Sequence, residues 1–229
     1  MRTAFFVDGY NLFYGLLADT RYKWLDLRSL LTHIVHIETP CSTIASVDYF
    51  TSSVKPSLAT RGRLSKEAQD TYIRALKTTG ISVHYGHHQL EPAKAPRFID
   101  RNTKASRQDK VAIWKLEEKE TDVHIALSMY RTAAKQAKLQ PHERVEQLVL
   151  VSSDTDMTPA LKAVREDFPA MTVGVILPHR AELNRPSPGS LKKHSHWMRR
   201  VVTCEELQSH QFPPRVPTHK APAIKPDYW

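Results

Sequence analysis

Short apolar runs that alternate with amphipathic segments constrain this fold more than any other feature of the sequence. "TAFFV" (residues 3–7) and "QLVLV" (147–151) are continuous apolar runs, typical of strands buried on both faces. Between such runs, apolar residues recur at helical spacing, most clearly over 122–138. Strands that alternate with helices predict an α/β protein, a three-layer sandwich with a mostly parallel central sheet.

The same periodicities place the other elements. Strands are expected at 3–7, 44–50, 81–86, 147–151, 172–177 and 200–203, and helices at 26–37, 63–79, 122–138, from Pro159 onward and at 204–210. Asp26 is the expected N-cap of its helix and Gly80 the expected C-terminal stop of another. Residues 87–120 show no clear period and are predicted to form an inserted loop. The proline-rich segment 211–229 is predicted to be an extended tail, which leaves 1–210 as the domain.

Composition limits the class of protein. A chain of 229 residues, 41% hydrophobic, suits one domain with a full core. Cys41 and Cys204 are too few for a disulfide framework or a structural zinc site. The apolar N-terminus is interrupted by Asp8 and Asn11, so it is predicted to be neither a signal sequence nor a membrane span. We therefore expect a cytoplasmic protein that does not contact a membrane.

The net charge of +9 is distributed unevenly. Residues 1–175 carry 24 basic and 20 acidic side chains (+4), whereas residues 176–229 carry 9 and 4 (+5). A basic segment attracts polyanions such as nucleic acids, although a solvated surface is the common alternative. The segment 179–200 is our candidate for contact with a phosphate backbone. Its cations are Arg180, Lys192, Lys193, Arg199 and Arg200.

Acidic residues stand where two strands end and where a helix begins. Asp8 follows the first strand, Asp154 and Asp156 follow "LVLVSS", and Asp122 begins the long helix. The carboxyl ends of neighbouring parallel strands meet at one edge of a sheet, where ligand sites gather. Several carboxylates together repel one another unless a hard cation such as Mg²⁺ or Mn²⁺ joins them. Each aspartate also has an ordinary alternative role, as a turn, cap or helix-dipole residue.

Three blocks of sequence resemble a known family. "FVDGYNLFYG", "EEKETDVHIALSMY" and "LVLVSSDTDMTPAL" resemble the signature blocks of NYN domain proteins, a bacterial branch of the PIN-like ribonuclease superfamily. The blocks occur in the family's order, and the resemblance extends over about residues 3–205. This sequence differs from the family pattern at three places. It lacks cysteines within 87–120, it has Ser153 where glycine is usual, and it has His124 where asparagine is common. These differences leave the carboxylates intact.

The resemblance implies a ribonuclease that requires Mg²⁺ or Mn²⁺ and acts on single-stranded or structured RNA. It assigns metal binding and catalysis to Asp8, Asp122, Asp154 and Asp156. Asn11 would hold Asp8 or a phosphate oxygen, and Ser152 and Ser153 match small hydroxyl residues of the family. Lys119 is a candidate phosphate contact, with a solvated lysine as its alternative. A homo-oligomer is compatible with the sequence.

Three other functions are alternatives for this sequence. The first is a non-catalytic RNA-binding or regulatory module that retains the fold. The second is a pyridine-ring hydroxylase, since some relatives carry that name, although the sequence shows no motif for flavin, haem or a facial triad. The third is a phosphatase of the haloacid dehalogenase type, which "DTDMT" matches. No paired acids follow a later strand, as such a phosphatase would require.

Overall fold

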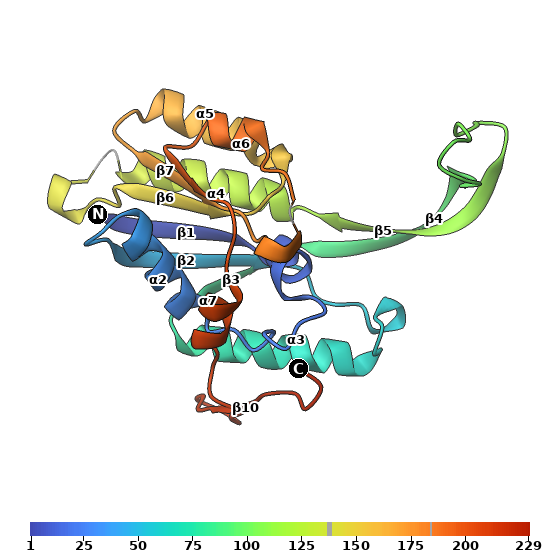
Figure 1. The fold of residues 1–229 in the computed structure, drawn as a ribbon, viewed down its shortest axis with the longest axis horizontal. Helices are drawn as coiled ribbons and strands as arrows, with labels where there is room; N and C mark the ends of the chain where they lie inside the picture. Colours follow the sequence, from blue (N-terminus) through green and yellow to red (C-terminus); the bar gives the residue numbers. More distant parts are fainter. Residues whose placement is uncertain (137–138, 184) are drawn as a thin grey trace.

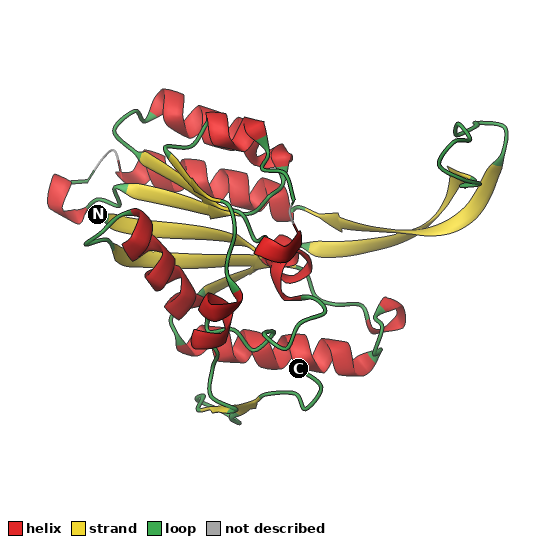
Figure 2. Ribbon diagram, in the orientation of Figure 1, coloured by secondary structure: helices red, strands yellow, loops and turns green. Residues whose placement is uncertain are grey.

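The computed structural model of the protein describes residues 1–136, 139–183 and 185–229. Its centre is a six-stranded sheet in the order β3-β2-β1-β6-β7-β8, in which every neighbouring pair is parallel. The strands are β1 (Arg2–Asp8), β2 (Thr43–Thr51), β3 (Ser82–Tyr85), β6 (Gln147–Val151), β7 (Thr172–Ile176) and β8 (Trp197–Arg199). Helices cover both faces of this sheet (Figures 1 and 2), which confirms the predicted three-layer α/β sandwich.

The two central strands are apolar because both of their faces are buried. Along β1, Phe5 and Val7 point into one hydrophobic cluster, and Ala4 and Phe6 point into the other. Such alternation follows from the two-residue period of a strand. Consequently the carboxyl ends of β1 and β6 are fixed rigidly side by side, with Val7 opposite Val151.

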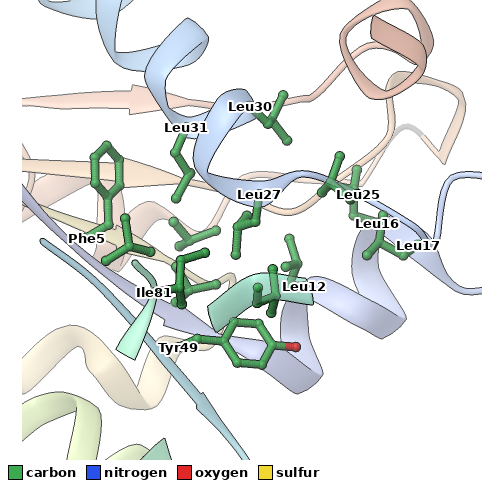
Figure 3. Close-up of a cluster of buried hydrophobic side chains, with 14 of the residues drawn as sticks. Phe5, Leu12, Leu16, Leu17, Leu25, Leu27, Leu30, Leu31, Tyr49 and Ile81 are labelled. Carbon is green, nitrogen blue, oxygen red and sulfur yellow. The ribbon is translucent and has the colours of Figure 1, made fainter. Parts of the chain in front are cut away.

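The helices divide between the two faces. One layer contains α4 (Thr121–Gln136), α5 (Thr158–Asp167) and α6 (Gly189–Lys193). The other contains α2 (Leu27–Glu38), α3 (Arg63–Thr78) and α7 (Cys204–Ser209). Figure 3 shows the cluster on the side of α2, where leucines of this helix pack with Phe5, Tyr49 and Ile81.

The helix boundaries largely follow the sequence signals. Asp26 caps α2 by accepting from the backbone N–H of Ser29, and Gly80 has a left-handed φ of +79° just after α3. The last two residues of the expected 122–138 helix lie outside the described residues. Short helical turns complete the chain: α1 (Gly9–Leu12), η1 (Phe13–Leu17), η2 (Pro56–Leu58), η3 (Pro141–Glu143), η4 (Thr155–Met157) and η5 (Ala181–Leu183).

The segment predicted as an inserted loop contains a long β-hairpin. β4 (His87–Pro96) and β5 (Lys110–Lys119) pair antiparallel in an unbroken register, and the hairpin projects away from the body (Figure 1). The prediction failed because neither strand buries a full face: Trp114, Ile113 and Leu116 are exposed. Without burial, the sequence is not selected for a clear apolar alternation.

Two further predictions near the C-terminus need correction. The last strand of the sheet is β8 (Trp197–Arg199), and not residues 200–203, since Trp197 packs on Gly174 of β7. The tail also folds back on the domain. It forms a small antiparallel pair of β9 (Arg215–Val216) and β10 (Ala223–Ile224), and Val216 and Ala223 are buried in the core. The proline-rich end is therefore part of the packed structure.

Among the described residues, none of the helices combines the length and the apolar character that crossing a membrane requires. Cys41 and Cys204 are both free thiols.

Candidate active site

Asp8 is the last residue of β1 and is held from two sides. Its Oδ1 accepts a 2.9 Å hydrogen bond from the backbone N–H of Asn11, so that Asp8 caps the helical turn α1. Its Oδ2 accepts a 3.1 Å hydrogen bond from Ser152 Oγ, at the end of β6. Asp8 is 5% exposed. Its carboxylate is therefore buried and fixed in orientation.

Asn11 and Ser153 form a second link between the two strand ends. The amide oxygen of Asn11 accepts from the backbone N–H of Ser153 at 3.1 Å and from its hydroxyl at 2.6 Å. The sequence suggested that the Asn11 side chain would hold Asp8 or a phosphate. In the structure its backbone N–H holds Asp8, and its side chain binds Ser153.

After β6, Asp154 caps the short turn η4 and Asp156 lies within it. Asp154 Oδ1 accepts a 2.9 Å hydrogen bond from the backbone N–H of Asp156, and the Asp154 N–H donates to Ser152 Oγ at 3.1 Å. Ser152 thus bridges Asp8 and Asp154. Asp154 thus has the cap role that was its ordinary alternative, and this hydrogen bond holds its carboxylate in place at the end of β6.

Asp122 lies in the first turn of α4, and Glu118 comes from the base of the hairpin. Glu118 Oε1 accepts from Thr121 Oγ1 at 2.6 Å and from Ser52 Oγ at 2.9 Å. Sequence reasoning missed Glu118, because the acidic run "EEKE" is typical of a solvated surface. Its position depends on the hairpin, which turns into α4 at Glu120, a residue with a left-handed φ of +75°.

These carboxylates act on one another electrostatically. Burial raises the pKa of Asp8 to about 6, and the charges of Asp122 and Glu118 add to this effect. Partial burial also raises the pKa of Asp122, together with the charges of Asp154, Glu118 and Asp156. Asp122 and Glu118 therefore act on Asp8, and Asp122 in turn is acted on by Asp154 and Asp156, so that a negative region extends along the carboxyl edge of the sheet.

This region matches a hard divalent cation in chemistry, since it offers only oxygen donors and an uncompensated negative charge. The side chains, however, are spread more widely than the ligands of a metal ion. Within residues 1–136, 139–183 and 185–229, no three His, Cys, Asp or Glu side chains are gathered as a set of metal ligands. Asp122 and Asp156 are exposed, so their carboxylates have room to change rotamer.

Two of the predicted cations belong to a helix that packs against the turn after β6. Lys192 and Lys193 are exposed in the last turn of α6, which packs against η4. Arg180 follows β7 and is half-buried, with its Nε lacking a hydrogen-bond partner among the described residues. Arg200 is exposed just after β8.

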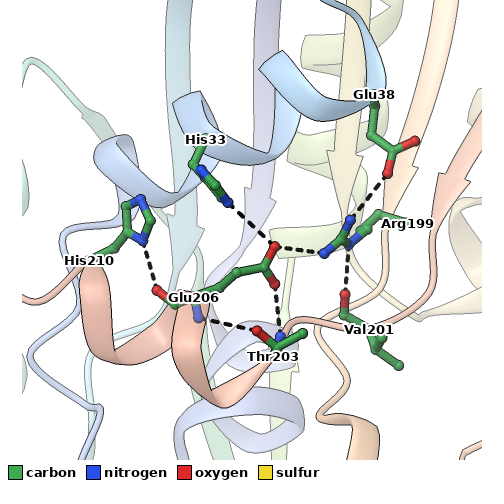
Figure 4. A network of polar contacts seen from close by, with 7 residues as sticks. All are labelled: His33, Glu38, Arg199, Val201, Thr203, Glu206 and His210. Atoms are coloured by element: carbon green, nitrogen blue, oxygen red, sulfur yellow. Dashed lines mark hydrogen bonds and ion pairs between the residues drawn. The ribbon is translucent and has the colours of Figure 1, made fainter.

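Arg199 and Lys119 are engaged within the protein. Figure 4 shows Arg199 in a polar network: it donates to Glu206 at 2.6 Å and to the carbonyl of Val201, and it lies 3.6 Å from Glu38. Lys119 donates to Glu117 Oε2 at 2.6 Å, on the same face of the hairpin. Trp197 donates to Gln147 at 3.1 Å and packs against the hydrophobic core, so it is engaged within the protein as well.

A parallel sheet covered by helices, with aspartates at the ends of adjacent strands and at a helix start, is the arrangement of a PIN-like protein. The model of the NYN domain matches residues 2–187 of this chain, and the chain belongs to the NYN domain family. NYN domains are generally nucleases, and this supports a nuclease-type, hydrolytic function.

Two individual proteins are also similar to this chain. The 6-hydroxy-3-succinoylpyridine 3-monooxygenase HspA of Pseudomonas putida (strain DSM 28022 / S16) is 32% identical over 252 residues, which cover 100% of this chain and 75% of the relative. A crystal structure of a protein of unknown function from Vibrio parahaemolyticus RIMD 2210633 aligns with a TM-score of 0.49 and 15% identity, over 89% of this chain and 92% of that one.

Proposed function

We propose that the protein is a divalent-metal-dependent ribonuclease. The observation that carries the proposal is the negative region of Asp8, Asp122, Asp154 and Asp156 in a chain of the NYN domain family. Mg²⁺ or Mn²⁺, when bound there, would supply the charge that activates water and neutralises the scissile phosphate.

The roles of the protein's own residues follow from their contacts. Asp8 and Asp154 are held in place by Ser152, so they would form the fixed part of the ligand set. Asp122 and Asp156 are exposed and would turn inward to complete it. Because Asn11 ties Ser153 to α1, directly after β1, it would keep the two strand ends at a constant separation while Asp122 and Asp156 turn inward.

Charge around the site favours an RNA substrate. The hairpin starts at the acidic region and carries cations toward its tip: residues 97–110 contain five (Arg97, Arg101, Lys104, Arg107, Lys110) against Asp100 and Asp109. Lys192 and Lys193 belong to α6, which packs against η4. A polyanion could therefore be attracted from both sides toward carboxylates that alone would repel it.

The test is cleavage of single-stranded and structured RNA with Mg²⁺ or Mn²⁺, comparing wild type with Asp154→Asn. This change keeps the side-chain shape and removes one charge, so we expect activity to fall by orders of magnitude while the protein stays folded. Asp227→Asn, at an exposed position in the tail, is the matched control. A folded Asp154→Asn protein that cuts at the wild-type rate would contradict the mechanism. An inactive wild type that binds RNA would favour the non-catalytic module.

The second candidate function is monooxygenation of a pyridine, and it comes from the name of the Pseudomonas putida relative. Identity of 32% across the whole chain is the specific observation in its favour. The test is oxygen consumption with 6-hydroxy-3-succinoylpyridine and a nicotinamide reductant. Substrate-dependent uptake that a heat-inactivated control lacks would support this function.

A further inference from the structure

A cavity of about 530 Å³ opens beside the acidic region, where the carboxyl ends of β1 and β2 meet α3 and the C-terminal tail. Cavities that hold small organic ligands measure roughly 300–1,000 Å³. Gly9, which follows Asp8 directly, forms part of its lining. A Cβ at Gly9 would lie 2.6 Å from the Tyr49 ring, so only glycine allows this ring to reach the cavity wall beside Asp8.

The lining is unusually aromatic. Seven of the lining residues are Tyr, Phe or Trp, and they come from four separate parts of the chain. Among the described residues, the hydroxyls of Tyr10, Tyr14 and Tyr49 make no hydrogen bond. Aromatic side chains with free hydroxyls suit a planar ring that carries polar substituents.

The C-terminal tail completes the cavity. Tyr228 donates to the carbonyl of Leu64 at 2.9 Å, and its ring lies under the Arg61 guanidinium at 4.5 Å. Trp229 packs edge-on against Tyr72, with ring centres 5.9 Å apart, and against Trp24 at 6.2 Å. The wall is therefore built by specific contacts from residues at the end of the sequence.

Two cations line the cavity without a carboxylate partner. Neither Lys23 nor Arg61 forms an ion pair with any described residue, and Asp19 is the one acidic side chain in the lining as far as the described residues go. The balance of charge favours an anion on the ligand.

We propose that this cavity binds a planar heteroaromatic ring that carries an anionic group. Two sources have this chemistry: one nucleotide of an RNA strand, with its phosphate, or a free heteroaromatic carboxylic acid. The nucleotide source deepens the proposed ribonuclease function and rests on it, because the cavity would then hold a base next to the scissile phosphate. Binding itself needs neither hydrolysis nor a metal.

The test is equilibrium binding by calorimetry in EDTA, with UMP, AMP, pyridine-3-carboxylate and uncharged uridine as ligands. We expect saturable binding of at least one anion, and weaker binding of uridine than of UMP if nucleotides are the ligand. Arg61→Gln and Tyr14→Leu should each weaken binding about tenfold, through the loss of a charge and of a stacking surface respectively. Arg74→Gln, an exposed arginine of α3 outside the cavity, is the control and should bind as wild type does.

The results of these measurements distinguish the two ligand sources from each other. Binding of UMP or AMP identifies the nucleotide source, and binding of pyridine-3-carboxylate alone identifies the free acid. No saturable binding of any anion, or binding that neither cavity variant weakens in proteins with wild-type melting, overturns the inference. RNA cleavage without ligand binding would remove the cavity inference and leave the proposed function, and ligand binding without cleavage would do the reverse.

Discussion

Ser152 Oγ donates a 3.1 Å hydrogen bond to Oδ2 of Asp8, and this joins the carboxyl ends of β6 and β1 within the buried part of the site. Ser152 is itself fully buried. The bond stabilises the ionised form of Asp8, yet burial outweighs it and the pKa of Asp8 rises to about 6. Burying the ionised carboxylate of Asp8 therefore costs free energy, which a bound cation would offset.

Asp8 should make the protein less stable as pH rises from about 4 to about 6. The folded state retains a proton that the unfolded state, with a pKa near 3.8, has already lost. The free energy of unfolding therefore falls over this range, by up to about 3 kcal/mol. Asp8→Asn should remove the contribution of Asp8 and leave the shallower slope that the raised pKa of Asp122 produces. Urea denaturation in EDTA at several pH values measures it, with Asp227→Asn as control; parallel profiles for wild type and Asp8→Asn would refute the prediction.

Asn11→Ala should destabilise the protein more than Ser153→Ala. The first change leaves both the N–H and the hydroxyl of Ser153 without Asn11, at a cost of about 1–3 kcal/mol. The second removes the hydroxyl but keeps the backbone bond, which should cost about 1 kcal/mol. Chemical denaturation of both variants gives the two free energies of unfolding. Equal losses of stability would show that Asn11 does not stabilise the protein through its bonds to Ser153.

Charge reversal at Lys192 and Lys193 should weaken RNA binding and make it less sensitive to salt. Each phosphate contact that is lost lowers the slope of log K against log salt by about 0.7–0.9. The matched control is the reversal of Arg74 and Lys77, which are exposed on α3 in the opposite helix layer. RNA titrations between low and moderate salt supply the slopes. If both double variants change the slope equally, the two lysines of α6 belong to a general solvated surface.

Arg199→Gln should reduce stability and leave the salt dependence of RNA binding unchanged. Glu206 is 8% exposed and would lose its closest cation, with His33 remaining at 3.7 Å. Removing one partner of a buried pair costs about 3 kcal/mol or more. Arg200→Gln, one residue further along and exposed, should change stability by less than about 0.5 kcal/mol. A shallower salt dependence of RNA binding for Arg199→Gln would show that Arg199 contacts RNA after all.

The sequence by itself determined the sandwich and the places where its acids stand. The strand and helix periods are local, so the continuous apolar run of β6 and the spacing in α4 could be recognised without the fold. Asp8, Asp122 and Asp154 follow from the ends of those elements. The parallel connection then requires the strand ends to meet at one edge.

Only the tertiary structure decided which of these groups act together. The hairpin is held by backbone pairing between two exposed strands, which leaves little trace in side-chain pattern, and so it was mistaken for a loop. Glu118 lies in the site only because the second strand of this hairpin ends next to Thr121, which donates a hydrogen bond to it. In the same way, Arg199 looks like a free cation in sequence, and Trp229 looks like the end of a tail. Their partners Glu206 and Trp24 come from chain segments that only folding brings into contact.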